Sequence, residues 1–136
     1  MTMLEVADAR ALAIASLAPS ADDDPNVQVS ADAVSPPTLV VYWADPWLEP
    51  ATTTGLRLAC TFTARLNVLA VAGRLEPGEG VAELERLVSY VIARLCPPDW
   101  SLPTVSTPLR WQAWQGPPEY LAAEIRYRVP VYTEGA

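Results

Sequence analysis

A stretch of strict alternation between residues 56 and 72 constrains the fold more than any other feature of this sequence. Every even position from Leu56 to Ala72 is apolar, while the odd positions begin polar and become apolar after Asn67, at Leu69 and Val71. A period of two indicates a β-strand with one face on a core. A strand end that is apolar on both faces indicates burial on both sides. We therefore expect a long strand whose C-terminal end is buried on both of its faces.

The length of this strand sets a second constraint. Seventeen extended residues at about 3.3 Å each span roughly 56 Å, whereas a compact domain of this size has a diameter of about 35–40 Å. Either the strand bends at a bulge, or its end is buried by another subunit. The pattern leaves both solutions open, and the second one predicts an oligomer.

Two segments have the spacing of helices. A form of capping box at Thr2–Glu5 precedes a modest amphipathic pattern that ends at Pro19. Its apolar positions are Leu4, Ala7, Ala11, Ile14, Ala15 and Ala18. Seven aliphatic residues recur three and four apart between Val81 and Leu95, and Pro97-Pro98 follows them. We expect a helix in each segment, the second being the main cover of a sheet.

Further strands are predicted at residues 38–43, 105–113 and 121–131, the last two forming a hairpin. The fold class expected from all these patterns is α+β. It would be a single domain of residues 1–136, with a mixed, mostly antiparallel sheet of about four strands, one of them long, covered by two helices. The segment 19–37 is acidic and rich in proline, which is typical of an extended loop. Its Asp22–Asp24 triplet lacks the glycine and glutamate of a calcium loop, so we interpret it as a solvated charge run.

Composition excludes several classes of function. The net charge is −7, and all nine positive charges are arginines, which disfavours nucleic-acid binding and adhesion to an anionic membrane. The chain contains no histidine and its two cysteines, Cys60 and Cys96, form no CxxC pair, so neither a metal site nor a cofactor is expected. Only a carboxylate such as Asp45 or Asp99 could serve as a general base. We expect no catalytic residue and no enzyme.

The five tryptophans are the remaining candidates for function. Trp43, Trp111 and Trp114 lie on or beside predicted strands and suit sheet packing. Trp47 instead follows Asp45-Pro46 in a predicted turn, and Trp114 falls on the otherwise polar face of its strand, so these two are also candidates for contact with a neighbour. Tryptophan and arginine are enriched at interface hot spots. The end of the long strand, where Leu69 and Val71 make the second face apolar, also has to be buried by other residues. The candidate oligomer or partner interface is therefore Trp47, Arg57, Arg65, Leu69, Val71 and Trp114.

The order of elements, together with short stretches of sequence, resembles a known family. A helix and a proline-rich loop lead to Leu39–Tyr42, an Asp-Pro-Trp-Leu turn stands at Asp45–Leu48, and the long strand precedes the helix Glu83–Leu95. The chain closes with Pro117–Ile125 and an alternating strand. Over roughly residues 5–132 this resembles the tail terminator, or tail completion, proteins of long-tailed bacteriophages.

The resemblance implies a virion structural protein at the head-proximal end of the tail, assembled in the cytoplasm of the host bacterium. It implies a hexameric ring that caps the tail tube, ends its polymerisation and joins the head–tail connector protein. Six copies would carry 6 × −7 = −42 charges, and we expect part of them to line the lumen, so that DNA passes without specific binding. Two alternatives stay open: a head–tail connector or stopper protein, and a monomeric small-ligand-binding domain.

Overall fold

The structure is a computed structural model that describes residues 4–29, 35–50, 59–73, 77–113 and 116–134. Its elements in chain order are β1 (Leu4–Glu5), α1 (Val6–Leu17), β2 (Asn26–Gln28), β3 (Thr38–Pro50), β4 (Ala59–Ala72), α2 (Pro77–Arg94), β5 (Thr104–Val105), β6 (Leu109–Ala113) and β7 (Gly116–Glu134). The α+β class is confirmed. The prediction of about four strands is wrong, because seven strands occur in the described ranges. Three of them, β1, β2 and β5, are too short to show any alternation in the sequence.

The seven strands form one mixed sheet. Its main path runs β1-β7-β4-β3-β2, and β5 and β6 pair with β7 beside this path. The pairs β3–β4, β4–β7, β5–β7 and β6–β7 are antiparallel, while β1–β7 and β2–β3 are parallel. The predicted hairpin is confirmed as β6–β7, and β7 begins at Gly116, before the predicted start at residue 121.

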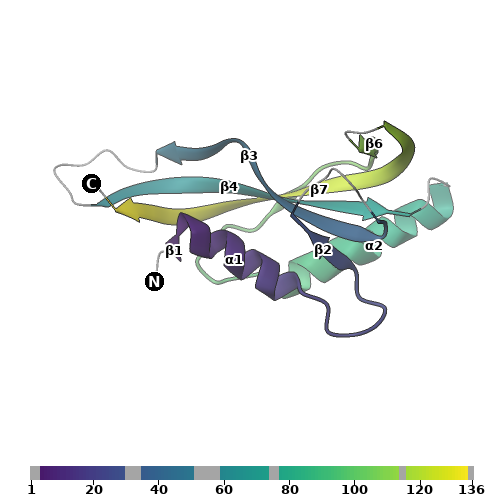
Figure 1. The fold of residues 1–136 in the computed structure, drawn as a ribbon, viewed down its shortest axis with the longest axis horizontal. Helices are drawn as coiled ribbons and strands as arrows, with labels where there is room; N and C mark the ends of the chain where they lie inside the picture. The colour runs from purple at the N-terminus through teal and green to yellow at the C-terminus, as the bar shows by residue number, and fades with distance from the viewer. Residues whose placement is uncertain (1–3, 30–34, 51–58, 74–76, 114–115, 135–136) are drawn as a thin grey trace.

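The long strand β4 is matched by an equally long partner. Its register with β7 is unbroken from Ala59 opposite Glu134 to Ala72 opposite Leu121, which corresponds to a ribbon of about 46 Å. Figure 1 shows this ribbon along the long axis of the molecule. A bulge in this strand is one of the two solutions that the sequence leaves open, but the irregularity lies in β3, where the register shifts between Trp43 and Leu48. The long strand is thus accommodated by an elongated domain, because β7 extends beside it.

The two faces of β4 enter different clusters, as the alternation predicted. Even positions from Ala64 to Ala72 join the larger cluster, to which α1 and α2 also contribute buried side chains. Leu69 and Val71, on the other face, are 3% and 0% exposed and form a second cluster with Val40 and Ala122. Their own chain already buries them. The expectation that another subunit covers these two side chains is therefore wrong.

The helix α1 buries a different face from the one that its sequence suggested. Its buried residues are Ala9, Ala13 and Leu17, at intervals of four. The small side chains of Ala9 and Ala13 let the helix approach the sheet closely, and the pairing of Leu4 and Glu5 with β7 fixes where the helix starts. Glu5 is itself the N-cap residue of α1, and its side chain makes no capping hydrogen bond. The predicted capping box, in which Glu5 would be the third helical residue, is therefore wrong.

The helix α2 begins at Pro77, earlier than predicted, and buries Leu84, Leu87 and Val91, while Leu95, directly after the helix, is buried as well. Two of its seven predicted apolar positions, Val81 and Ile92, are instead exposed. In Figure 1 the two helices lie end to end along one side of the β4–β7 ribbon. The C-terminal ends of the helices meet there, since the Tyr90 hydroxyl donates to the Leu17 carbonyl at 2.9 Å.

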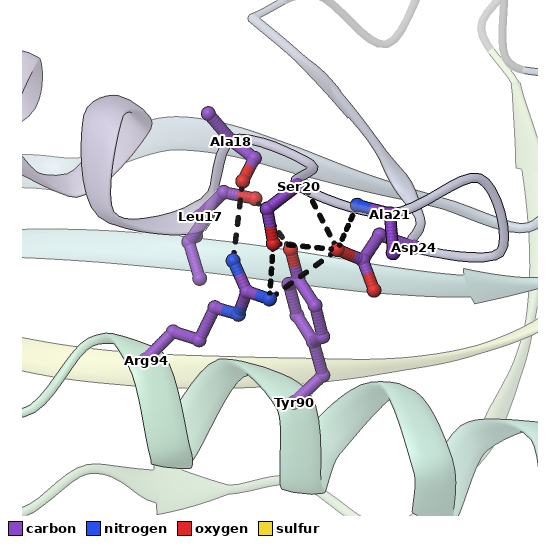
Figure 2. A network of polar contacts seen from close by, with 7 residues as sticks. All are labelled: Leu17, Ala18, Ser20, Ala21, Asp24, Tyr90 and Arg94. Atoms are coloured by element: carbon purple, nitrogen blue, oxygen red, sulfur yellow. Dashed lines mark hydrogen bonds and ion pairs between the residues drawn. The ribbon is translucent and has the colours of Figure 1, made fainter.

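The acidic segment 19–37 is more structured than an extended loop, since it contains β2. Asp24 in this segment accepts hydrogen bonds from the amides of Ser20 and Ala21 and pairs with Arg94 at 3.3 Å (Figure 2). Arg94 also donates to the Ala18 carbonyl just beyond α1. The interpretation of the triplet as a solvated charge run therefore holds for the exposed Asp22 and Asp23 and is wrong for Asp24.

Candidate functional site: an apolar groove and an apolar sheet edge

An apolar groove lies between α1 and the irregular part of β3. Its volume is about 620 Å³, and its apolar lining comes from two tryptophans of β3 and from the outward side of α1. The lining residues are Glu5, Val6, Ala7, Arg10, Ala11, Ile14, Trp43 and Trp47. Ala7, Ala11 and Ile14 belong to the stripe that the sequence suggested as the apolar face of the helix. In the folded chain this stripe lines an open groove, since Ala9, Ala13 and Leu17 occupy the core.

The two tryptophans of this groove are held by the shape of β3. Between Trp43 and Leu48 the strand advances five residues while β4 advances two, from Leu66 to Ala64. The extra residues bring the rings of Trp43 and Trp47 to a centroid distance of 5.2 Å at an angle of 43°. Such tilted pairs are favourable aromatic contacts. Trp47 nevertheless stays 42% exposed, so it forms part of the accessible wall of the groove.

Arg65 anchors the irregular segment from the neighbouring strand. Its guanidinium donates from Nη1 to the Pro46 carbonyl at 3.2 Å, and its Nε lies 3.6 Å from Glu49. Arg128, the register partner of Arg65, lies 3.6 Å from the same Glu49 oxygen. One carboxylate between two guanidiniums offsets the repulsion of the facing arginines. Arg65 thus positions the irregular segment of β3 that carries Trp47.

The structure brings together two of the six candidate interface residues. Trp47 lies in the wall of the groove and Arg65 supports the segment behind it. Leu69 and Val71 are buried in the second cluster, on the opposite face of β4 from the larger core. Arg57 and Trp114 lie outside the described residues, so the prediction for these two stays untested.

A second apolar surface lies at the other edge of the sheet, beyond β7. Its exposed side chains are Leu102, Val105 and Leu109, contributed by the loop before β5 and by β5 and β6. Backbone bonds hold this segment to β7: the Ser101 amide donates to the Arg128 carbonyl at 3.4 Å, and the Ser106 amide donates to the Glu124 carbonyl at 2.9 Å. We call this surface the β7 edge. The tertiary pairing reveals it, because Val105 and Leu109 belong to the predicted strand 105–113 whereas Leu102 lies outside that pattern.

The tryptophans of the groove and the β7 edge belong to different strands, although the groove extends across the sheet to Glu5 of β1, which pairs with β7. In the order β7-β4-β3, the β7 edge is attached to the outer side of β7, while the tryptophans belong to β3. β2 is the strand beside β3 on its other side. Within the described part of the chain, β2 pairs with residues 38–40 of β3 and does not extend to the tryptophans. The chain therefore has two unlike apolar surfaces, and β4 lies between the strand of the tryptophans and the strand that carries the β7 edge.

The polar residues between these surfaces are engaged with one another. The Tyr42 hydroxyl donates to Glu124 at 2.7 Å, and the Asn67 amide donates to the same carboxylate oxygen at 3.4 Å. Burial, followed by the hydrogen bond to Glu124, raises the pKa of Tyr42 to about 12. A tyrosine that stays protonated at neutral pH acts here as a hydrogen-bond donor, so this cluster ties β3, β4 and β7 together.

No protein-family model matches this chain, and no curated protein matches it. Among the described residues, no group of three or more cysteine, aspartate or glutamate side chains is placed to hold a metal ion. None of the helices in the described ranges combines the length and apolarity needed to span a bilayer. The groove and the β7 edge are thus the features of the described structure that point most directly to a function.

Proposed function

We propose that this chain is a virion assembly protein that closes into a homo-oligomeric ring, caps the tail tube of a long-tailed bacteriophage and ends its polymerisation. The ring, a hexamer by resemblance, would also join the head–tail connector protein. The observation that carries the proposal is the pair of unlike apolar surfaces, a groove between α1 and β3 and the exposed side chains of the β7 edge. Contacts between unlike surfaces are head-to-tail, and they form a closed ring when the rotation between subunits allows it.

The exposure of these surfaces supports association rather than a solitary monomer. Contiguous apolar patches on soluble monomers are small, and larger ones mark binding sites. Trp47 adds a residue type that is enriched at the energetic centre of interfaces. In this proposal the groove beside α1 and the β7 edge serve for contacts between copies. The proposal assigns no reaction to the chain.

The acidic charge of the chain fits a ring through which DNA passes. With −7 per copy, a ring has a large excess of negative charge, and the exposed Asp22 and Asp23 belong to this excess. Negative charge near the lumen repels the DNA backbone. We therefore expect DNA to pass through the ring without specific binding.

Electron microscopy of the purified protein mixed with tail tubes tests this proposal. A terminator adds density at one end of the tube, whereas a connector or stopper protein binds the portal complex. Light scattering across a concentration series gives the mass of the free protein. A monomer in solution that also fails to bind tube ends would contradict an assembly role; a monomer that binds tube ends would not.

The groove favours one candidate function of another class, a monomeric small-ligand-binding domain. Its volume of about 620 Å³ lies within the range of small-molecule sites, and apolar and aromatic linings are typical of such sites. A monomer whose tryptophan fluorescence responds to saturating amounts of an apolar small molecule, with loss of the response in Trp47→Ala, would support this alternative. The ring proposal expects no such saturable response.

A further inference from the structure

The outer edge of β3, on the side away from β4, changes character halfway along the strand. The residues from Thr38 to Val41 are buried, and the run from Leu39 to Trp43 contains no charge and no proline. A flat apolar edge of this kind is a template for pairing with another chain. Beyond Trp43 the strand carries two acidic residues and two prolines, and its register with β4 shifts. Each of these features discourages pairing, so it is the first half of the edge that needs a cover.

Residues 20–28, which we call the strap, supply this cover. The strap ends in β2, which pairs in parallel with Thr38–Val40 through three register positions, and the Thr38 hydroxyl donates to the Asn26 carbonyl at 3.0 Å. The residues of β2 are exposed or half-buried, and an open pocket of about 500 Å³ lies between the strap and α1. Buried Pro25 and half-buried Val27 add apolar contacts. The sheet alone therefore gives the strap a limited hold.

Arg94 of α2 adds a second hold at the beginning of the strap. Its guanidinium donates to the Ser20 hydroxyl at 2.9 Å and lies 3.3 Å from Asp24, whose carboxylate also accepts the Ser20 amide at 2.8 Å (Figure 2). The turn that carries Arg94 is itself fixed, because Val91 and Leu95 on either side of it are buried in the core. The strap is thus fastened at its beginning to α2 and at its end to β3.

We propose that the strap is a latched guard of the β3 edge. When the contacts of Arg94 are broken, the strap leaves β3 as a unit, and the apolar half of the edge becomes available for strand pairing. β3 stays in place without the strap, because its register with β4 runs from Thr38 opposite Val71 to Pro50 opposite Phe62. Segments with few buried contacts open at a lower free energy than the core. This inference goes beyond the proposed ring and does not depend on it.

Hydrogen exchange tests whether Arg94 controls the strap. In Arg94→Ala the amides of residues 20–28 should exchange roughly tenfold faster than in the wild type, and their rate should rise by a larger factor than that of residues 64–72 in β4. Asp24→Ala removes the other side of the latch and should give the same pattern. Arg86→Ala, on the same helix and paired with Glu83, should leave the exchange of both segments unchanged.

The dependence of this exchange on urea separates release of the strap from unfolding of the whole chain. Local opening exposes less surface than global unfolding, so the exchange free energy of the strap should fall less steeply with urea than that of β4. Equal slopes for the two segments would show that the strap opens only when the chain unfolds and would overturn the inference. Strap exchange that is unchanged in Arg94→Ala would overturn it as well.

A disulfide between β2 and β3 tests what the strap guards. Asn26 is the register partner of Thr38, and neighbouring strands lie about 4.8 Å apart, within the Cα separation that a disulfide bridges. Asn26→Cys with Thr38→Cys, in a Cys60→Ala, Cys96→Ser, Arg94→Ala chain, holds the strap when oxidised and frees it when reduced. We expect light scattering and thioflavin T fluorescence to rise with concentration in the reduced chain. The oxidised chain should instead match the reduced chain in which Arg94 is retained.

Equal association of the oxidised and reduced chains would overturn the guarding role, and so would a reduced chain that does not associate. Thioflavin T fluorescence separates the pairing of strand edges from closure into a ring, because a ring of folded subunits contains no stacked cross-β array. Failure of the protein to bind tube ends would overturn the proposed function and would leave the latched strap standing.

Discussion

The guanidinium of Arg94 lies 3.3 Å from the carboxylate of Asp24 and joins the end of α2 to the loop that follows α1 (Figure 2). The last turn of α1 has no basic residue of its own. Arg94 places a positive charge beside the Ala18 carbonyl at this end, where a cation is favoured by the helix dipole. Its guanidinium also lies 4.5 Å over the Tyr90 ring. One side chain of α2 therefore holds both the end of α1 and the acidic loop.

This arrangement predicts a loss of stability in acid that depends on Asp24. The amide of Ser20 donates to its carboxylate and lowers the pKa of Asp24, with further contributions from Ala21 and Arg94. A carboxyl group whose pKa is lower in the folded state stabilises the fold above its unfolded pKa, and this contribution is lost as the pH falls below about 4. Asp24→Asn should remove this part of the pH dependence in urea unfolding between pH 3 and 6. Asp23→Asn, at an exposed neighbour, should leave it unchanged.

The face that α1 buries can be tested with a matched pair of substitutions. Ala13 is fully buried against the sheet, whereas Ala11 is exposed and lines the groove. Ala13→Leu should lower the free energy of unfolding by about 1–3 kcal/mol because it overpacks a filled site. Ala11→Leu should change it by no more than about 0.5 kcal/mol. Equal effects in chemical denaturation would show that the helix is rotated relative to this structure.

The Tyr127 hydroxyl carries a buried hydrogen bond that can be removed alone. It donates to the Leu95 carbonyl at 2.8 Å, near the end of α2. Tyr127→Phe leaves this carbonyl without that bond and should cost about 1–3 kcal/mol of stability. Burial raises the pKa of Tyr127 to about 12, so the wild type should lose stability as the pH rises above 10 toward 12. Ultraviolet titration should show one high-pH tyrosine fewer in the variant, and an unchanged titration would contradict the assignment.

The role of Arg65 can be read from the tryptophans that it supports. Arg65→Ala removes the hydrogen bond to the Pro46 carbonyl and frees the segment between Trp43 and Trp47. We expect a weaker near-ultraviolet circular dichroism signal, together with little change in far-ultraviolet signal, because the ring pair loses its fixed geometry. Arg86→Ala, at a surface residue paired with Glu83 three positions away, is the control. An Arg65 variant whose spectrum matches that of the control would show that the ring pair is held without Arg65.

The sequence by itself determined the features that depend on local periodicity. The alternation from Leu56 to Ala72 predicted a long strand, and the change after Asn67 predicted that Leu69 and Val71 are buried on a second face. Each follows from the fact that successive side chains of a strand point to opposite faces. The two helices, the β6–β7 hairpin and the irregularity around Asp45-Pro46 follow from the same kind of local signal.

Only the tertiary structure decided what covers each surface. Leu69 and Val71 are buried by their own chain, and α1 turns its alanines inward at positions 9 and 13, because packing against the sheet overrides a weak apolar stripe. The contact between Asp24 and Arg94 joins residues 70 positions apart, which no local pattern encodes. The same is true of the groove and of Leu102, whose exposure depends on which strands lie beside them.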